Sequence, residues 1–138
     1  MALRVRRRRL PAELVAVHLA FEGCAAHVDL AQRAMLRCVP SSARSMALPL
    51  EVGAETVRLA LADARAAMPG WRHRTLEGAW QSCAASLSAT LADLDGAVAR
   101  AADTRELEVA LTAVQDLLEP LHAFVDAAEA FDRLKTRS

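Results

Sequence analysis

The chain has 138 residues, of which 54% are apolar and 25% charged, with five Gly and five Pro. This composition excludes a disordered or collagen-like chain, and the length fits one domain with one hydrophobic core. The formal net charge is zero, but residues 1–74 carry a net +6 and residues 75–138 a net −6. We expect the two halves to pair, either within one fold or across a dimer.

The chain opens with a basic tail over residues 1–10, whose five arginines are Arg4, Arg6, Arg7, Arg8 and Arg9. Such a tail could bind nucleic-acid phosphates, or fold back on the acidic half of its own chain. Together with Leu14–Phe21 and Cys24 it also imitates an export signal with a lipoprotein-type cysteine. Three residues argue against export: Glu13 opens the apolar segment, His18 lies inside it, and Glu22 occupies a position where a lipoprotein signal needs a small apolar residue.

Apolar residues then recur at steps of four and three, which predicts a helix from about Pro11 to Arg37. The pattern continues unbroken past the apparent export cleavage site, which favours a helix over a signal. No apolar stretch approaches the roughly 20 residues needed to span a bilayer. The seam consists of Leu10, Leu14, Val17, Phe21, Cys24, Val28, Ala31, Met35 and Cys38.

Three further helices are predicted from the same periodicity, over about Leu50–Met68, from between Trp71 and Thr75 to Ala102, and from Thr104 to Lys135. Asp103 and Glu106 form a capping box for the last one, and Pro120 should kink it. Only antiparallel stacking buries four such helices in one chain of this length. The sequence therefore predicts an all-α, up-down-up-down four-helix bundle over residues 11–138. Its first, third and fourth helices are long and its second is shorter.

Some bundles bind metal through Glu-x-x-His motifs, and Glu119 and His122 supply one such motif here. The i, i+4 pairs His18/Glu22 and His73/Glu77 could each add two ligands from one helix face. A second Glu-x-x-His is absent from the sequence, so a transition-metal or small-ligand site is an alternative rather than the main expectation.

Three cysteines, Cys24, Cys38 and Cys83, are odd in number and widely spaced, so we expect buried free thiols in a reducing, cytoplasmic compartment. Cys24 and Cys83 fall on apolar seams, where burial raises a thiol pKa and opposes activation as a nucleophile. No catalytic residues are predicted.

Trp71, Arg72 and Arg74 lie at a predicted helix junction, where Trp71 either caps the bundle or anchors a partner protein. Together with the arginine tail they are the candidate partner-binding residues. The sequence favours a non-enzymatic protein acting through protein–protein association, as a homodimer or an accessory subunit. A nucleic-acid-associated protein that contacts phosphates through the tail is the second alternative.

Overall fold

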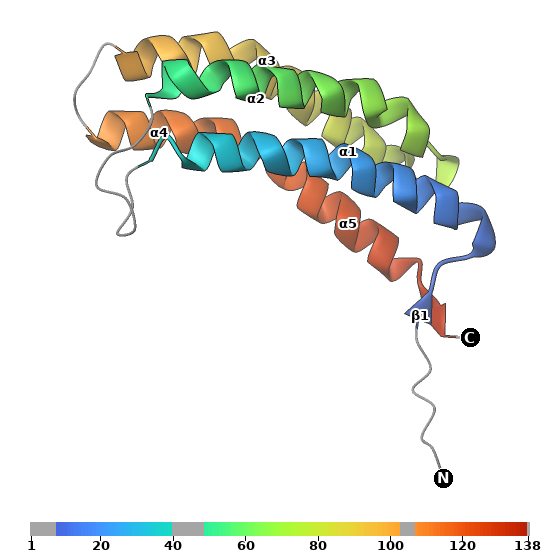
Figure 1. The fold of residues 1–138 in the computed structure, drawn as a ribbon. Helices are drawn as coiled ribbons and strands as arrows, with labels where there is room; N and C mark the ends of the chain where they lie inside the picture. Colours follow the sequence, from blue (N-terminus) through green and yellow to red (C-terminus); the bar gives the residue numbers. More distant parts are fainter. Residues whose placement is uncertain (1–7, 40–48, 103–106, 138) are drawn as a thin grey trace.

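The computed structural model describes residues 8–39, 49–102 and 107–137. The predicted all-α class is confirmed, since four helical segments pack against one another (Figure 1). The α-helices are α1 (Ala12–Leu36), α2 (Leu50–Ala67), α3 (Glu77–Ala102), α4 (Leu107–Leu118) and α5 (Ala123–Arg133). Three 3₁₀ turns connect them: η1 (Met68–Trp71), η2 (Arg74–Leu76) and η3 (Glu119–His122).

Helix α1 begins directly after Pro11, whose φ of −52° already suits a helix start. The predicted apolar seam is the buried face of this helix. Seven of its members are buried and Leu10 and Val17 are half-buried against the same core. The seam prediction is therefore confirmed.

Helices α1 and α2 pack closely because small residues and thiols lie between them. The Cys24 thiol donates a hydrogen bond to the Ala64 carbonyl at 3.1 Å, and the Cys38 thiol donates to the Pro49 carbonyl at 3.8 Å. A Cβ atom on Gly53 would lie 2.9 Å from the Cys38 sulfur, so only glycine fits there without a shift. Later residues of α1 thus contact earlier residues of α2.

The connection between α2 and α3 contains two 3₁₀ turns and is longer than expected. Pro69 lies in η1, a second turn η2 follows, and α3 begins only at Glu77. The predicted start between Trp71 and Thr75 was therefore too early, although the predicted end at Ala102 agrees. The Asp103–Glu106 capping box lies outside the described residues.

The predicted kink at Pro120 is confirmed, because η3 interrupts the fourth helical segment and separates α4 from α5. Figure 1 shows α5 leaving the direction of α4 toward the start of α1. Helix α5 ends at Arg133, two residues before the predicted end. The bend brings Phe124 and Phe131 into the core.

An aromatic cluster fills the end of the bundle where α1 begins. Phe21 lies 4.9 Å, between ring centroids, from both Trp71 and Phe131, and 6.4 Å from Phe124. The His18 ring lies 4.9 Å from that of Phe131. The cluster joins α1, η1 and α5, which are distant in sequence.

Two strands that the sequence did not predict close the same end. Strand β1 (Arg8–Arg9) pairs antiparallel with β2 (Thr136–Arg137), with Arg8 opposite Arg137 and Arg9 opposite Thr136. We call this pair the terminal ribbon. It holds the two ends of the described chain together (Figure 1).

The expectation that no segment reaches bilayer length needs correction. Helix α1, at 25 residues, is long and apolar enough to cross a membrane by length and composition. Core helices of soluble proteins and signal sequences share this property.

Candidate functional site

The outer surface of α1 and α2 carries large apolar side chains that face solvent. Leu30 is 53% exposed on α1, and Val52 and Leu59 are 58% and 59% exposed on α2. We call these three residues the outer patch. Isolated exposed leucines are ordinary, so the question is whether the three lie on one face.

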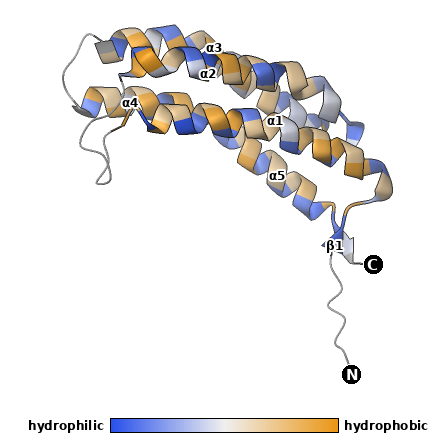
Figure 2. Ribbon diagram, in the orientation of Figure 1, coloured by the Kyte–Doolittle hydropathy of each residue, from blue (hydrophilic) through white to orange (hydrophobic). Residues whose placement is uncertain are grey.

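Helix geometry places the outer patch on a single face. Cys24 contacts Ala64 and Cys38 contacts Pro49, so residue numbers rise along α1 as they fall along α2. Between these two contacts, Leu30 lies across from the turn of α2 that contains Leu59. At 100° per residue, both side chains project from the outside of the α1–α2 pair. Figure 2 shows hydrophobic colour over much of α1.

Charges of both signs surround the outer patch. Arg33 pairs with Asp29 at 2.8 Å, and both are exposed. Arg58 contacts Asp95 of α3 at 2.6 Å and Glu55 at 3.8 Å. The bond to Asp95 raises the pKa of the Arg58 guanidinium. These charges are paired within the chain, so they oppose the meeting of two copies less than unpaired charges would.

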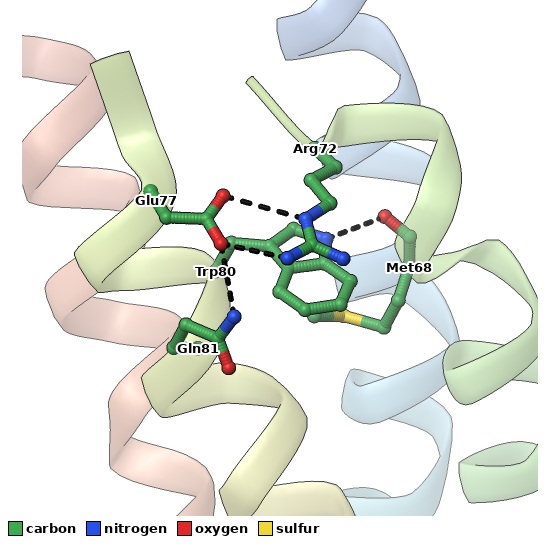
Figure 3. A network of polar contacts seen from close by, with 5 residues as sticks. All are labelled: Met68, Arg72, Glu77, Trp80 and Gln81. Atoms are coloured by element: carbon green, nitrogen blue, oxygen red, sulfur yellow. Dashed lines mark hydrogen bonds and ion pairs between the residues drawn. The ribbon is translucent and has the colours of Figure 1, made fainter. Parts of the chain in front are cut away.

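The predicted partner-binding residue Arg72 belongs to a polar network at the junction of η1 and α3 (Figure 3). Its guanidinium contacts Glu77 at 2.8 Å and lies 4.2 Å from the centre of the Trp80 ring. Gln81 donates to Glu77 at 2.9 Å, and the Trp80 indole donates to the Met68 carbonyl at 2.8 Å. Arg72 and Gln81 both lower the pKa of the Glu77 carboxyl.

This network connects η1 to the first turns of α3. The Arg72 guanidinium is already engaged within the chain by Glu77 and Trp80. Arg72 is still half-exposed. Arg74 is exposed on η2. The junction is therefore a structural contact between η1 and α3, with two exposed arginines, Arg72 and Arg74, on its surface.

The interpretation of Trp71 as a partner anchor is wrong. Its side chain is 0% exposed and lies within the aromatic cluster. The indole N–H approaches the Cys24 sulfur, a weak acceptor, and partly offsets the rise that burial causes in the Cys24 pKa. It forms no hydrogen bond of acceptable geometry within the described chain. The turn through Pro69 carries Trp71 inward.

The arginine tail is described in part. Arg4, Arg6 and Arg7 lie outside the described residues, whereas Arg8 and Arg9 are exposed in the terminal ribbon. The Arg8 guanidinium donates to the Lys135 carbonyl at 3.2 Å. The described end of the tail thus contacts the C-terminal end of the chain through Arg8.

The C-terminal segment that Arg8 contacts, however, carries basic as well as acidic residues. Arg133 and Lys135 come from the C-terminal side, and Glu129 and Asp132 lie beside them. A hollow of about 230 Å³ is lined by Arg8, Glu129, Asp132 and Arg133. Lys135, and more weakly Arg8 and His18, lower the pKa of the Asp132 carboxyl.

The candidate metal ligands are not gathered together. Across the described ranges, no group of three or more His, Cys, Asp or Glu side chains is placed to hold a metal ion. His18 and Glu22 do approach, at 3.4 Å. His73 instead accepts a hydrogen bond from the Thr75 amide, and Glu77 pairs with Arg72.

The remaining two candidate ligands line a shallow groove between α1 and the α4–α5 segment. The groove has a volume of about 610 Å³ and is lined by Gln32, Gln115, Leu118, Glu119, His122 and Val125. His122 is exposed and lies 3.6 Å from Asp126. The groove is open to solvent. Among the described residues, its Glu119 and His122 have no third ligand with which to hold a metal ion.

Cys24, Cys38 and Cys83 are buried, as predicted. Burial raises the pKa of Cys24, and burial with the nearby Cys24 and Asp126 raises that of Cys83 to about 12. Thiols held in this protonated form are poor nucleophiles.

Comparison with protein-family models, curated proteins and solved structures finds no match to this chain. The outer patch and the terminal ribbon are the features that sequence reasoning missed. Leu30, Val52 and Leu59 lie off the core seams, and a second search for apolar residues on the outer faces could have found them.

Proposed function

We propose that the protein is a non-enzymatic helical bundle that acts by protein–protein association, and that its partner is a second copy of the same chain. The observation that carries this proposal is the outer patch, where Leu30, Val52 and Leu59 are each more than half exposed on one face. Burying them against a partner removes apolar surface from water, the main driving force of association.

The dimensions and charges of the face support a second copy as the partner. Helix α2, at 18 residues, is about 27 Å long, and two adjacent helices are about 20 Å wide. The resulting footprint, on the order of 500 Å² in projection, approaches the area of a standard interface, about 800 Å² of accessible surface per partner. The mixed charges around it allow self-complementary contacts across a two-fold axis.

Light scattering coupled to size exclusion tests this proposal. We expect a dimer for the native chain and a monomer for Leu30→Glu/Leu59→Glu, because the added carboxylates would be buried unpaired at the interface. Val125→Glu, a similarly exposed apolar site on α5, is the matched control and should remain dimeric. A native monomer, or a dimer that survives the double substitution, contradicts the proposal.

The same preparation separates this function from the metal-binding alternative. Elemental analysis of protein purified without an affinity tag should find far less than one equivalent of transition metal. A stoichiometric metal lost on substitution of His18 and Glu22 would favour a metal-binding bundle instead.

We further propose an antiparallel up-down-up-down order with a shorter second helix, and a cytoplasmic location. The reversed order of the Cys24–Ala64 and Cys38–Pro49 contacts supports antiparallel packing of α1 and α2. An odd number of widely spaced, buried cysteines suits a reducing compartment. Distance measurements between spin labels at the helix ends, and fractionation of the native host, test these two points.

A further inference from the structure

Beyond association with a second copy, we propose that the end of the bundle bearing the terminal ribbon binds the surface of an anionic lipid membrane. The contact combines Arg8 and Arg9 of β1, with Lys135 just before β2, and the exposed apolar residues Val15 and Leu19 of α1. The protein would lie on the membrane without crossing it.

Strand pairing concentrates positive charge at this end. It joins Arg8 and Arg9 to a C-terminal segment that contains Arg133, Lys135 and Arg137 in sequence. Arg133 contacts Glu129 at 3.7 Å and Lys135 contacts Asp132 at 3.0 Å, so these cations and acids neutralise each other. The excess positive charge therefore comes from Arg8 and Arg9, against one further exposed acid, Glu13, in the first turn of α1.

Arg9 remains available for an anion, and Arg8 remains so in part, because one of its N–H groups donates to the Lys135 carbonyl at 3.2 Å. Neither lies within ion-pair distance of a carboxylate in the described part of the chain, although Arg8 does influence Asp132. Both are exposed in β1. Arginine presents a planar fork that binds phosphate oxygens in pairs.

Apolar surface begins next to these cations. Val15 is 49% and Leu19 62% exposed, and they lie one and two turns into α1 from the ribbon. Both point away from the buried seam of Leu14 and Phe21. Cations beside an exposed apolar helix face are typical of interfacial membrane binding, in which apolar side chains enter the headgroup region and cations meet anionic lipids.

These apolar neighbours favour a lipid surface over a nucleic acid. A nucleic-acid site needs cations that follow a phosphate backbone, commonly with aromatic side chains on which bases stack. Trp71 and the nearby phenylalanines are buried in the core. Val15 and Leu19 would gain nothing from contact with phosphates.

Vesicle co-sedimentation of the full chain tests the proposal, with phosphatidylserine-rich vesicles, phosphatidylcholine vesicles and a labelled DNA duplex as parallel probes. We expect binding to the phosphatidylserine vesicles alone, weakened by added salt. Arg8→Gln/Arg9→Gln should weaken binding about tenfold or more, since each cation contributes roughly fivefold, and Lys135→Gln should weaken it about fivefold. Leu19→Glu should also weaken it about tenfold.

Two controls keep the test specific. Arg37→Gln/Arg100→Gln removes the same charge from exposed sites at the opposite end and should bind normally. Leu30→Glu/Leu59→Glu disrupts the outer patch and should still bind vesicles, so failure of the dimer proposal is distinguishable. Absence of vesicle binding, indifference to Leu19→Glu, or equal binding to the DNA duplex overturns the proposal.

Discussion

The indole ring of Trp71 meets the ring of Phe21 edge to face, with the centroids 4.9 Å apart and the planes at 73°. This geometry is favourable for an aromatic pair. It connects the turn η1 to the first helix, and Phe131 of α5 lies against both rings. The largest buried side chain of the bundle therefore holds together three segments that are distant in sequence.

Replacing Trp71 by Ala should lower the free energy of unfolding by about 3–5 kcal/mol, because it leaves a large cavity among aromatic rings. Urea denaturation followed by circular dichroism measures the change. Exposed Arg74→Ala serves as the neighbouring control and should be nearly neutral. A small loss for Trp71→Ala, comparable to that of the control, would contradict the buried position.

The helical glycines Gly23 and Gly53 should respond oppositely to alanine. A Cβ on Gly23 meets nothing within 4 Å, so Gly23→Ala should stabilise the protein by about 0.5–1 kcal/mol through helix propensity. On Gly53 a Cβ would lie 2.9 Å from the Cys38 sulfur and 3.6 Å from the Ala34 carbonyl oxygen. The resulting crowding, about 1–3 kcal/mol, should cancel or exceed the propensity gain.

Thermal unfolding of the two glycine variants side by side gives the comparison directly. Both substitutions make the same chemical change in an α-helix, so the difference in their melting temperatures reports the α1–α2 contact. Equal stabilisation of both variants would mean that the two helices are farther apart than described.

Stability should fall at alkaline pH because of Cys83. Its pKa rises from 9.0 to about 12 in the fold, so above pH 9 the unfolded chain loses a proton that the folded chain retains. Between these values the native state binds more protons, and each pH unit removes about 1.4 kcal/mol of stability. Below pH 9 both states hold the proton and the effect is absent.

The Cys83→Ala variant isolates this contribution. Its unfolding free energy, measured by urea titration from pH 8 to pH 11, should decline less steeply than that of the native chain. Parallel slopes would show that Cys83 titrates normally and is accessible to solvent.

Trp80→Phe should lower stability by about 1 kcal/mol, because it removes the indole donor to the Met68 carbonyl and keeps an aromatic ring beneath Arg72. Chemical denaturation measures the loss. The companion variant Arg72→Gln removes the surface ion pair with Glu77 and leaves this hydrogen bond, so its midpoint should barely move. A larger loss of stability for Arg72→Gln than for Trp80→Phe would show that the ion pair, and not the hydrogen bond, stabilises the junction.

The regular parts of the fold were predictable because they depend on local chemistry. The seam from Phe21 to Cys38 follows helix periodicity, and the interruption at Pro120 follows from its missing N–H. Both appear where the sequence placed them.

The features that the sequence left open or missed depend on distant contacts. The basic neighbours Arg72 and Arg74 allowed Trp71 to be either a cap on the bundle or a partner anchor, and only the turn η1, which carries it against Phe21, decides for a buried position. The terminal ribbon joins arginine-rich ends with little strand propensity, and only the convergence of α1 and α5 brings them together. Neither the burial of Trp71 nor the pairing of β1 with β2 can be predicted from neighbouring residues alone, because both depend on segments distant in sequence.

The terminal ribbon also has a topological consequence. Arg9 and Thr136 are opposite each other, so a short linker could join the two ends of the described chain into a ring. A new start could then be opened between α1 and α2, giving a circular permutant with every helix pairing retained. The order of helices along the chain could thus be changed while their arrangement in space stays the same.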